Sequence, residues 1–293
     1  MFHGGNQMTG IVDVGGGLRG AFSAGLCDRF LETGVKFDLC IGVSAGSANL
    51  ISYTSQNDGR LKRFYLNYTM RKEYMGFGNL IKTGSYVGLD YIYSTLSTEG
   101  GEDPMDFDTF FTTATDFVAV TTFAESGKAV YFDKSAFGQN DLTPIKASCC
   151  IPIACKPISI DGHDYFDGGL SDPIPFKKAF EMGCDKVVVV ISRPKEYRKS
   201  KQKLLPIIKA ALKKYPEVYK AISVRHEVYN RQLEEALELE KQGKVLILAP
   251  KDCYGVNTLT RNPESLEKLY NEGVSCANRN LDALRAFCAA ERR

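Results

Sequence analysis

The sequence lacks a long apolar segment and a charge of one dominant sign. No apolar run approaches the roughly 18 residues that a membrane-spanning helix needs, and the longest one, 187–191, has the length of a strand. Residues 1–8 lack the basic flank and apolar stretch of a secretory signal. The formal net charge of +2 gives no overall attraction to nucleic acid or anionic lipid. We therefore expect a cytoplasmic protein without a nucleic-acid partner, whose contact with a membrane, if there is one, is local and peripheral.

Histidine is scarce, and the cysteines show no metal-binding spacing. The three histidines, His3, His163 and His226, lie far apart in the sequence, and no C-x-x-C pair occurs. The nine cysteines are an odd number, and several, such as Cys40 and Cys149, stand in apolar runs, which is typical of reduced core residues. The sequence therefore predicts neither a metal site nor a disulfide framework.

Short apolar runs alternate with helical patterns over much of the chain. An amphipathic helix is predicted over 20–33, between the first two strands. The predicted strands are 10–14, 37–42, 116–123, 128–132, 185–192 and 244–249. Such alternation predicts a central, mostly parallel sheet with helices on both faces, which is a three-layer α/β/α sandwich.

We expect one domain over 1–293, with a core at about 10–192 and a helical, basic part at about 193–293 packed on it. The later part belongs to the same domain because the strand predicted at 244–249 needs a sheet to join. The basic residues of 193–214 are typical of a solvated helix face, and contact with lipid headgroups is the alternative. Residues 59–101, rich in aromatic side chains and broken by glycines, receive no assignment.

A glycine-rich loop follows the first predicted strand. Gly15, Gly17 and Gly20 form a G-x-G-x-x-G pattern that opens a helix, so its backbone N–H groups can face an anion. One use of such a loop is dinucleotide binding, for which Asp38 stands at the expected distance to hold a ribose. A second use is an oxyanion hole for a tetrahedral acyl intermediate. The loop alone leaves both uses open, together with a plain turn.

A serine elbow follows the second predicted strand. Gly42, Ser44 and Gly46 form a G-x-S-x-G pattern, in which a sharp turn exposes the serine hydroxyl and small neighbours avoid collisions. The N–H of Ala45 then points toward the developing oxyanion. Because both loops leave the same edge of a parallel sheet, the pair of motifs favours the oxyanion use of the glycine loop.

The base that would activate Ser44 is less evident. His226 stands on a charged helix, where an exposed histidine is common. Asp167 ends a predicted strand, and Gly168 and Gly169 after it let the carboxylate approach another loop closely. A triad of Ser44, Asp167 and His226 also stays open, because that chain order occurs in α/β-hydrolases.

These three motifs, in this order, resemble those of the patatin-like phospholipases. The resemblance covers roughly 10–192, including the stretch 147–152 before the aspartate motif, and the part after 193 is more similar to bacterial members than to plant storage proteins. It implies a Ser44–Asp167 dyad without histidine. The oxyanion-hole residues that it implies are Gly15, Gly16, Gly17, Arg19, Gly20 and Ala45, and the supporting glycines are Gly42, Gly46, Gly168 and Gly169.

The resemblance implies a serine-dependent lipid acyl hydrolase of the phospholipase A or lysophospholipase type. Ser44 would attack an ester carbonyl and form an acyl-enzyme, and no cofactor or metal would take part. Arg19 would brace the glycine loop rather than touch the lipid or ester substrate. The alternatives are an esterase with the triad named above, a nucleotide-binding protein that uses the glycine loop with Asp38, and an idle protein of the same fold.

Overall fold

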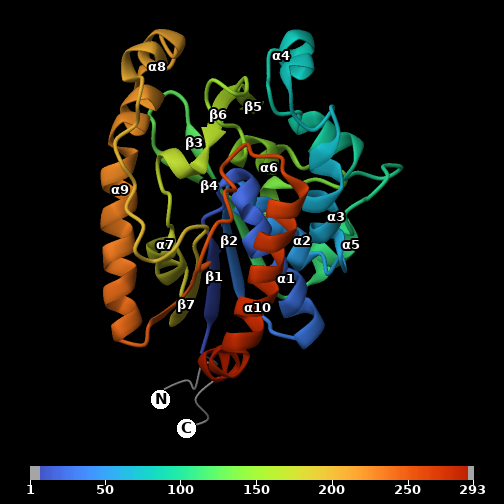
Figure 1. The fold of residues 1–293 in the computed structure, drawn as a ribbon, viewed down its shortest axis with the longest axis vertical. Coiled ribbons are helices and arrows are strands. Elements are labelled where there is room, and N and C mark those ends of the chain that lie inside the picture. The colour runs from blue at the N-terminus through green and yellow to red at the C-terminus, as the bar shows by residue number, and fades with distance from the viewer. Residues whose placement is uncertain (1–6, 290–293) are drawn as a thin grey trace.

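The computed structural model describes residues 7–289, and its centre is an eight-stranded sheet (Figure 1). The strand order is β5-β6-β3-β2-β1-β7-β8, and β4 pairs with β3 outside this path. The path from β3 through β2, β1 and β7 to β8 is parallel, whereas the pairs β3–β4, β3–β6 and β5–β6 are antiparallel. The strands are β1 (Thr9–Asp13), β2 (Leu39–Val43), β3 (Asp116–Phe123), β4 (Ala129–Asp133), β5 (Ile158–Ile160), β6 (His163–Asp167), β7 (Lys186–Val190) and β8 (Val245–Leu248).

Helices cover both faces of the sheet, and each face has its own apolar core. One face carries α1 (Ala21–Thr33), α2 (Ala45–Thr54), α3 (Arg60–Leu66) and α10 (Pro263–Cys288), and the other carries α7 (Phe176–Glu181) and α9 (Pro216–Lys241) (Figure 1). The valine-rich strand β7 is buried from Val187 to Val190 because helices shield both of its faces. The predicted three-layer α/β/α sandwich with a mostly parallel sheet is confirmed.

Short helices fill the remaining connections. They are η1 (Gly17–Gly20), η2 (Tyr68–Met70), α4 (Phe77–Thr83), η3 (Tyr91–Thr95), α5 (Phe107–Thr112), η4 (Lys134–Ala136), α6 (Thr143–Ser148), η5 (Gly168–Leu170) and α8 (Leu205–Ala211). The segment 59–101, which the sequence left without an assignment, contains α3, η2, α4 and η3. Helices α4 and α8 project at the end of the molecule toward which β1 and β2 run (Figure 1).

The part of the chain after residue 193 contributes to both the sheet and a helix layer. Strand β8 extends the sheet beside β7. Helix α10 packs closely on α1, where Gly25 faces the backbone of Tyr270 and Gly273 faces the backbone of Phe22. A side chain at either glycine would overlap the other helix, so these two positions permit the close approach.

Within residues 7–289, no helix is both long and apolar enough to cross a membrane. The same residues hold no group of three or more His, Cys, Asp or Glu side chains arranged to bind a metal ion. The nine cysteines, all of which are described, are free thiols, and most of them are buried.

Candidate active site

Two strands meet end to end on one side of β3. Strand β2 runs parallel to β3, and its last residue, Val43, pairs with Val120. Strand β6 runs antiparallel to β3, and its last residue, Asp167, pairs with Thr121. Because β4 occupies the other side of β3 at Thr121, β2 and β6 point toward each other along the same side. Ser44, which follows β2, is therefore brought next to Asp167.

Ser44 lies on a strained turn between β2 and α2. Its φ of 56° and ψ of −133° are rare for a residue with a side chain. The Ser44 N–H donates to Ser148 Oγ at 3.0 Å, and that hydroxyl donates to the Val120 carbonyl at 2.7 Å. Gly46 passes so close to Asp13 that a side chain at this position would overlap it. These contacts hold the turn in one conformation, and Ser44 is 7% exposed.

The Asp167 carboxyl is buried beside the Ser44 hydroxyl. Its Oδ1 accepts a hydrogen bond from the Gly169 N–H at 2.8 Å, and its carbonyl accepts one from Thr122 Oγ1 at 2.8 Å. Burial raises the pKa of Asp167, while the Arg225 guanidinium, a hydrogen bond with the Ser44 side chain and the Gly169 N–H oppose the rise. A buried carboxylate in contact with a serine hydroxyl can accept its proton.

Three consecutive glycines form the loop after β1. Gly15, Gly16 and Gly17 have φ values of 64°, 128° and 62°, in the region that residues with side chains rarely adopt. The Gly15 N–H donates to Asp13 Oδ1 at 2.9 Å. The predicted oxyanion role therefore does not extend to the Gly15 amide, because Asp13 already accepts its proton.

Three other amides of the two turns are free to bind an anion. Among residues 7–289, no hydrogen bond engages the N–H groups of Gly16, Gly17 or Ala45. Ala45 begins α2, whose N-terminus contributes a positive partial charge. Gly20, also predicted at the oxyanion hole, ends η1, and its carbonyl accepts a hydrogen bond from Asn49 Nδ2 at 3.1 Å. The candidate oxyanion donors are thus the amides of Gly16, Gly17 and Ala45.

A buried polar network supports the glycine loop. Asn49 Nδ2 donates to Ser23 Oγ at 2.6 Å and lies 3.4 Å from Asp13 Oδ2. Burial raises the pKa of Asp13 to about 6, although its hydrogen bonds oppose this rise. Tyr65 Oη donates to Asn49 Oδ1 at 3.1 Å. Side chains from α1, α2 and α3 therefore fix the position of the loop.

A narrow cavity of about 70 Å³ lies beside Ser44, and we call it the apolar cavity. Gly17 and Ala45 line it next to the serine, so the candidate oxyanion donors border this space. Most of its other walls are aliphatic or aromatic side chains, among them Leu18, Leu61, Phe64, Met75, Val87, Leu89 and Ile92. An apolar cavity beside a serine hydroxyl suits the hydrocarbon part of an ester.

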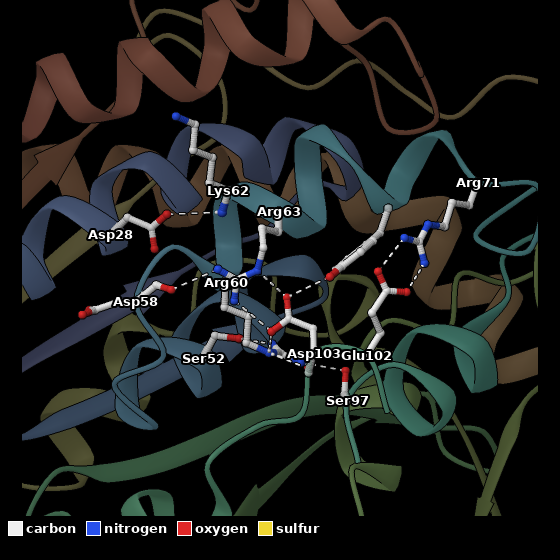
Figure 2. Close-up of polar contacts among 11 residues, drawn as sticks. Asp28, Ser52, Asp58, Arg60, Lys62, Arg63, Arg71, Ser97, Glu102 and Asp103 are labelled. Atoms are coloured by element: carbon white, nitrogen blue, oxygen red, sulfur yellow. Dashed lines mark hydrogen bonds and ion pairs between the residues drawn. The ribbon is translucent and has the colours of Figure 1, made fainter. Parts of the chain in front are cut away.

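Arg60 is buried in the wall of the apolar cavity, and its charge is compensated (Figure 2). Its two Nη atoms donate to Ser52 Oγ at 2.6 Å and Ser97 Oγ at 2.7 Å, and its Nε lies 3.8 Å from Asp103 Oδ1. Asp103 also accepts two hydrogen bonds from Arg63, at 2.7 and 2.9 Å. Burial lowers the pKa of Arg60 to about 10, and Asp103 opposes that change.

A second cavity, of about 360 Å³, lies across the glycine loop from the apolar one. Gly15 and Gly16 line this second cavity, Gly17 lines the first, and Thr258 lines both. We call it the basic cavity because of its cationic side chains, Arg19, Arg193, Lys199 and Arg225. Arg19, predicted at the oxyanion hole, thus borders the basic cavity, and its Nη1 donates to Thr258 Oγ1 at 3.2 Å.

Asp38 does not lie near the glycine loop. It precedes β2 at the amino edge of the parallel strands, where its carboxylate accepts a hydrogen bond from the Thr9 N–H at 2.6 Å. Gly15 and Ser44 follow β1 and β2 at the opposite edge. The length of a strand separates Asp38 from the loop, so the structure does not support the predicted ribose contact.

His226, the third member of the alternative triad, lies on α9. Within the described part of the chain, it forms no hydrogen bond with Ser44 or Asp167. The residue of α9 that reaches this region is its neighbour Arg225, whose Nε donates to the Gly169 carbonyl. The geometry therefore favours the pair of Ser44 and Asp167 over the triad.

Sequence reasoning missed several residues that position the site. Asp13 ends β1 directly before the glycine loop, so its place in the chain was a usable signal. Ser148 and Arg225 stand on helices, and nothing in the sequence shows that they contact the Ser44 turn and the Gly169 carbonyl. His163 is exposed at the start of β6, and His3 lies outside the described residues.

Two family models match the sequence. Residues 14–180 match the model described as patatin-like phospholipase. Residues 215–289 match a model described as a domain of unknown function, DUF6363. Among curated proteins, the chain is similar to the uncharacterized protein YjjU of Escherichia coli strain K12, with 30% identity over 191 residues. The match covers 64% of this chain and 52% of YjjU, so the chain spans about half the length of that relative.

Two solved structures are also similar in fold. The structure of VipD from Legionella pneumophila matches with a TM-score of 0.48 and 15% identity, covering 94% of this chain and 67% of VipD. The structure of the type III effector protein ExoU matches with a TM-score of 0.40 and 12% identity, covering 96% of this chain and 53% of ExoU.

Proposed function

The chain belongs to the patatin-like phospholipase family, and from this membership we propose that it is a lipid acyl hydrolase with Ser44 as nucleophile and Asp167 as general base. The reaction is hydrolysis of a carboxylic ester, of the phospholipase A or lysophospholipase type. The observation that carries the proposal is the end-to-end meeting of β2 and β6, which puts a serine hydroxyl beside a buried carboxylate.

The first half of the reaction transfers the acyl group to the protein. Asp167 accepts the hydroxyl proton while Ser44 Oγ attacks the ester carbonyl, and a tetrahedral intermediate forms. The amides of Gly16, Gly17 and Ala45 donate to its negatively charged oxygen. The bond to the leaving alcohol then breaks, and the alcohol takes the proton from Asp167.

The second half returns the enzyme to its starting state. Asp167 accepts a proton from water, and the resulting hydroxide attacks the acyl-Ser44 carbonyl. The same amides stabilise the second intermediate, whose collapse releases the fatty acid and returns the proton to Ser44 Oγ. Throughout both halves the apolar cavity beside Ser44 contacts the part of the hydrocarbon chain next to the ester.

Helices α4 and α8 supply a peripheral contact with a membrane surface. Phe77 and Ile81 on α4 are 74% and 86% exposed, and Leu204 and Ile207 at α8 are 68% and 64% exposed. Both helices project at the end of the molecule that holds the site (Figure 1). Exposed apolar side chains at this end can enter the lipid interface from which a substrate is drawn.

The proposal is tested by labelling the purified protein with a fluorophosphonate probe, which reacts only with an activated serine. We expect one label, located at Ser44 by mass spectrometry and absent from Ser44→Ala. Because Asp167→Asn removes the base, we expect labelling and ester hydrolysis to fall by about 10²–10⁴-fold. Ser126→Ala, which changes an exposed serine in the β3–β4 turn, is the matched control and labels like the wild type.

One further variant separates the dyad from the triad. His226→Ala is expected to keep the wild-type labelling rate, because His226 does not contact either member of the pair in the described structure. Loss of labelling in His226→Ala would replace the dyad by the triad. A folded wild-type protein that takes no label would refute the hydrolase proposal itself.

A further inference from the structure

The basic cavity concentrates positive charge that no carboxylate of the described residues pairs with directly. Arg19, Arg193, Lys199 and Arg225 line the cavity together. Within residues 7–289, none of the four forms an ion pair, although fifteen pairs between a lysine or arginine and a carboxylate occur elsewhere in the described structure. Partly buried cations that repel one another destabilise a fold unless an anion joins them.

The guanidinium of Arg19 is only partly satisfied. Its Nη1 donates to Thr258 Oγ1, but its Nε is buried and has no hydrogen-bond partner among the described residues. Burial, followed by repulsion from Arg193, lowers the pKa of Arg19 to about 10. A buried donor of this kind is normally paired, so the hydrogen-bonding capacity of Arg19 is not used up by the described residues.

The lowered pKa of Lys199 has the same causes, burial and an excess of positive charge in the basic cavity. Burial and the guanidinium groups of Arg225, Arg19 and Arg193 lower the pKa of its amine to about 7, and Asp167 acts in the opposite direction. The carboxylate of Asp167 is one negative charge beside four cationic side chains. The cluster therefore keeps an excess of positive charge.

The glycine loop packs tightly against this cluster. A side-chain carbon at Gly16 would lie 3.2 Å from Arg19 Nη2 and would overlap Ser192 Oγ, so only glycine lets the loop pass this close. The space for a ligand is the cavity itself, whose volume of about 360 Å³ accommodates a tetrahedral anion bound by several donors.

The position of the basic cavity relates it to the proposed reaction. The apolar cavity and the basic cavity lie on the two sides of the glycine loop, and Ser44 borders the first. An ester whose hydrocarbon chain occupies the apolar cavity can extend its alcohol part across the loop. Arg193, Lys199 and Arg225 all lie after residue 180, outside the patatin-like match, so this charge is supplied by another part of the chain.

We propose that the basic cavity binds a phosphate group carried by the alcohol part of the substrate, with Arg19, Arg193, Lys199 and Arg225 as its ligands. The inference rests on the proposed function for its connection to catalysis, but the binding of phosphate does not. Arginine is suited to the role because its planar fork donates two hydrogen bonds to phosphate oxygens.

Isothermal titration calorimetry with inorganic phosphate tests the site directly. We expect the wild type to bind phosphate, and Arg193→Gln and Lys199→Gln each to bind it about tenfold more weakly or worse, because each removes one charged donor. Lys201→Gln, which neutralises an exposed lysine of the same segment, is the matched control and keeps the wild-type affinity. The melting temperature of each variant shows that it is folded.

A pair of soluble esters then identifies the source of the phosphate. Octanoyl glycerol phosphate and octanoyl glycerol share the scissile ester and differ only in the phosphate group. If the substrate carries the anion, kcat/KM is at least about tenfold higher for the phosphate ester in the wild type, and this ratio falls in Arg193→Gln. Phosphate binding without a preference between the esters would support the site and assign it to free phosphate.

Absence of phosphate binding to the folded wild type, together with equal rates on the two esters, would overturn the inference. Failure of the proposed function is a different result. In that case neither ester is cleaved and Ser44 takes no fluorophosphonate, while calorimetry still reports whether the basic cavity binds phosphate.

Discussion

Arg60 and Arg193 each line a cavity beside the glycine loop, but they differ in how their charge is balanced. The charge of Arg60 is met by Asp103, and its donors are taken up by two serine hydroxyls (Figure 2). Arg193 and the three other cations of the basic cavity have no ion-pair partner among the described residues. The charge of Arg60 is therefore balanced within the protein. The charge of the basic cavity, in our proposal, is balanced by a bound phosphate group.

The largest effect on stability is expected when Asp103, the carboxylate that balances the charge of Arg60 in the wall of the apolar cavity, is removed. Asp103→Ala leaves Arg60, whose side chain is 5% exposed, without its carboxylate. Breaking such a buried pair costs about 3–5 kcal/mol in the free energy of unfolding. Urea denaturation monitored by circular dichroism measures the change.

Two variants sharpen this contrast. Glu102→Ala removes the neighbouring carboxylate, which pairs with Arg71 at the surface, and little change in stability is expected because exposed pairs contribute little. Arg193→Gln removes one cation from the basic cavity, so the protein is expected to keep or gain stability. Equal losses for Asp103→Ala and Arg193→Gln would contradict the distinction between the two cavities.

A second, smaller effect concerns the pH dependence of anion binding. Lys199, with a pKa lowered to about 7 by burial and by three guanidinium groups, is charged below pH 7 and neutral above it. The affinity of the basic cavity should therefore fall as pH rises, by up to about tenfold per pH unit above 7. Sulfate is the appropriate probe in calorimetry between pH 6 and 9, because its own charge is constant there.

Variants identify the group that titrates. Lys199→Arg is expected to flatten the pH profile, because a guanidinium keeps its proton over this range. Asp167→Asn should leave the slope above pH 7 in place. The other titratable groups near Lys199 are Arg19, Arg193, Arg225, Tyr197, Tyr229 and Cys253. A slope that survives in Lys199→Arg would assign the titration to one of these.

The smallest effect is expected at the tip of α4. This helix lies in the excursion of the chain between Met75 and Val87, which pair with each other and both line the apolar cavity. Ile81→Asn should weaken binding to phosphatidylcholine vesicles by roughly fivefold, the equivalent of about 1 kcal/mol of apolar burial. Cosedimentation measures the change, and Val224→Asn, at an exposed valine of α9, is the matched control.

The strands and motifs that were predicted correctly from the sequence are those encoded by consecutive residues. The strands at β1, β2, β3 and β7 were predicted within two residues of their observed bounds, because each is a short apolar run between turn residues. The loop at Gly15–Gly20 and the elbow at Ser44 are contiguous motifs, and the family that they indicated is confirmed. The catalytic roles of Ser44 and Asp167 stay predictions.

The parts that sequence did not predict depend on contacts between distant segments. The basic cavity joins η1, the connection after β7, and α9, so nothing in the sequence brought Arg19 of the glycine loop together with the cations that follow residue 192. Asp38 was counted at the correct sequence distance from the glycine loop, but it precedes β2 instead of following it. The short helices of 59–101 have too few turns to show a helical period.

The meeting of β2 and β6 on β3 ties the proposed activity to correct strand pairing. Val43 and Asp167 face consecutive residues of β3, so hydrogen-bond register fixes the separation of Ser44 and Asp167. A slip of either strand by one residue would shift it about 3.3 Å and turn its side chains to the opposite face. Under the proposed dyad, a chain that has collapsed but not yet paired its strands correctly does not bring the two groups together, and hydrolase activity appears only when both strands are in register.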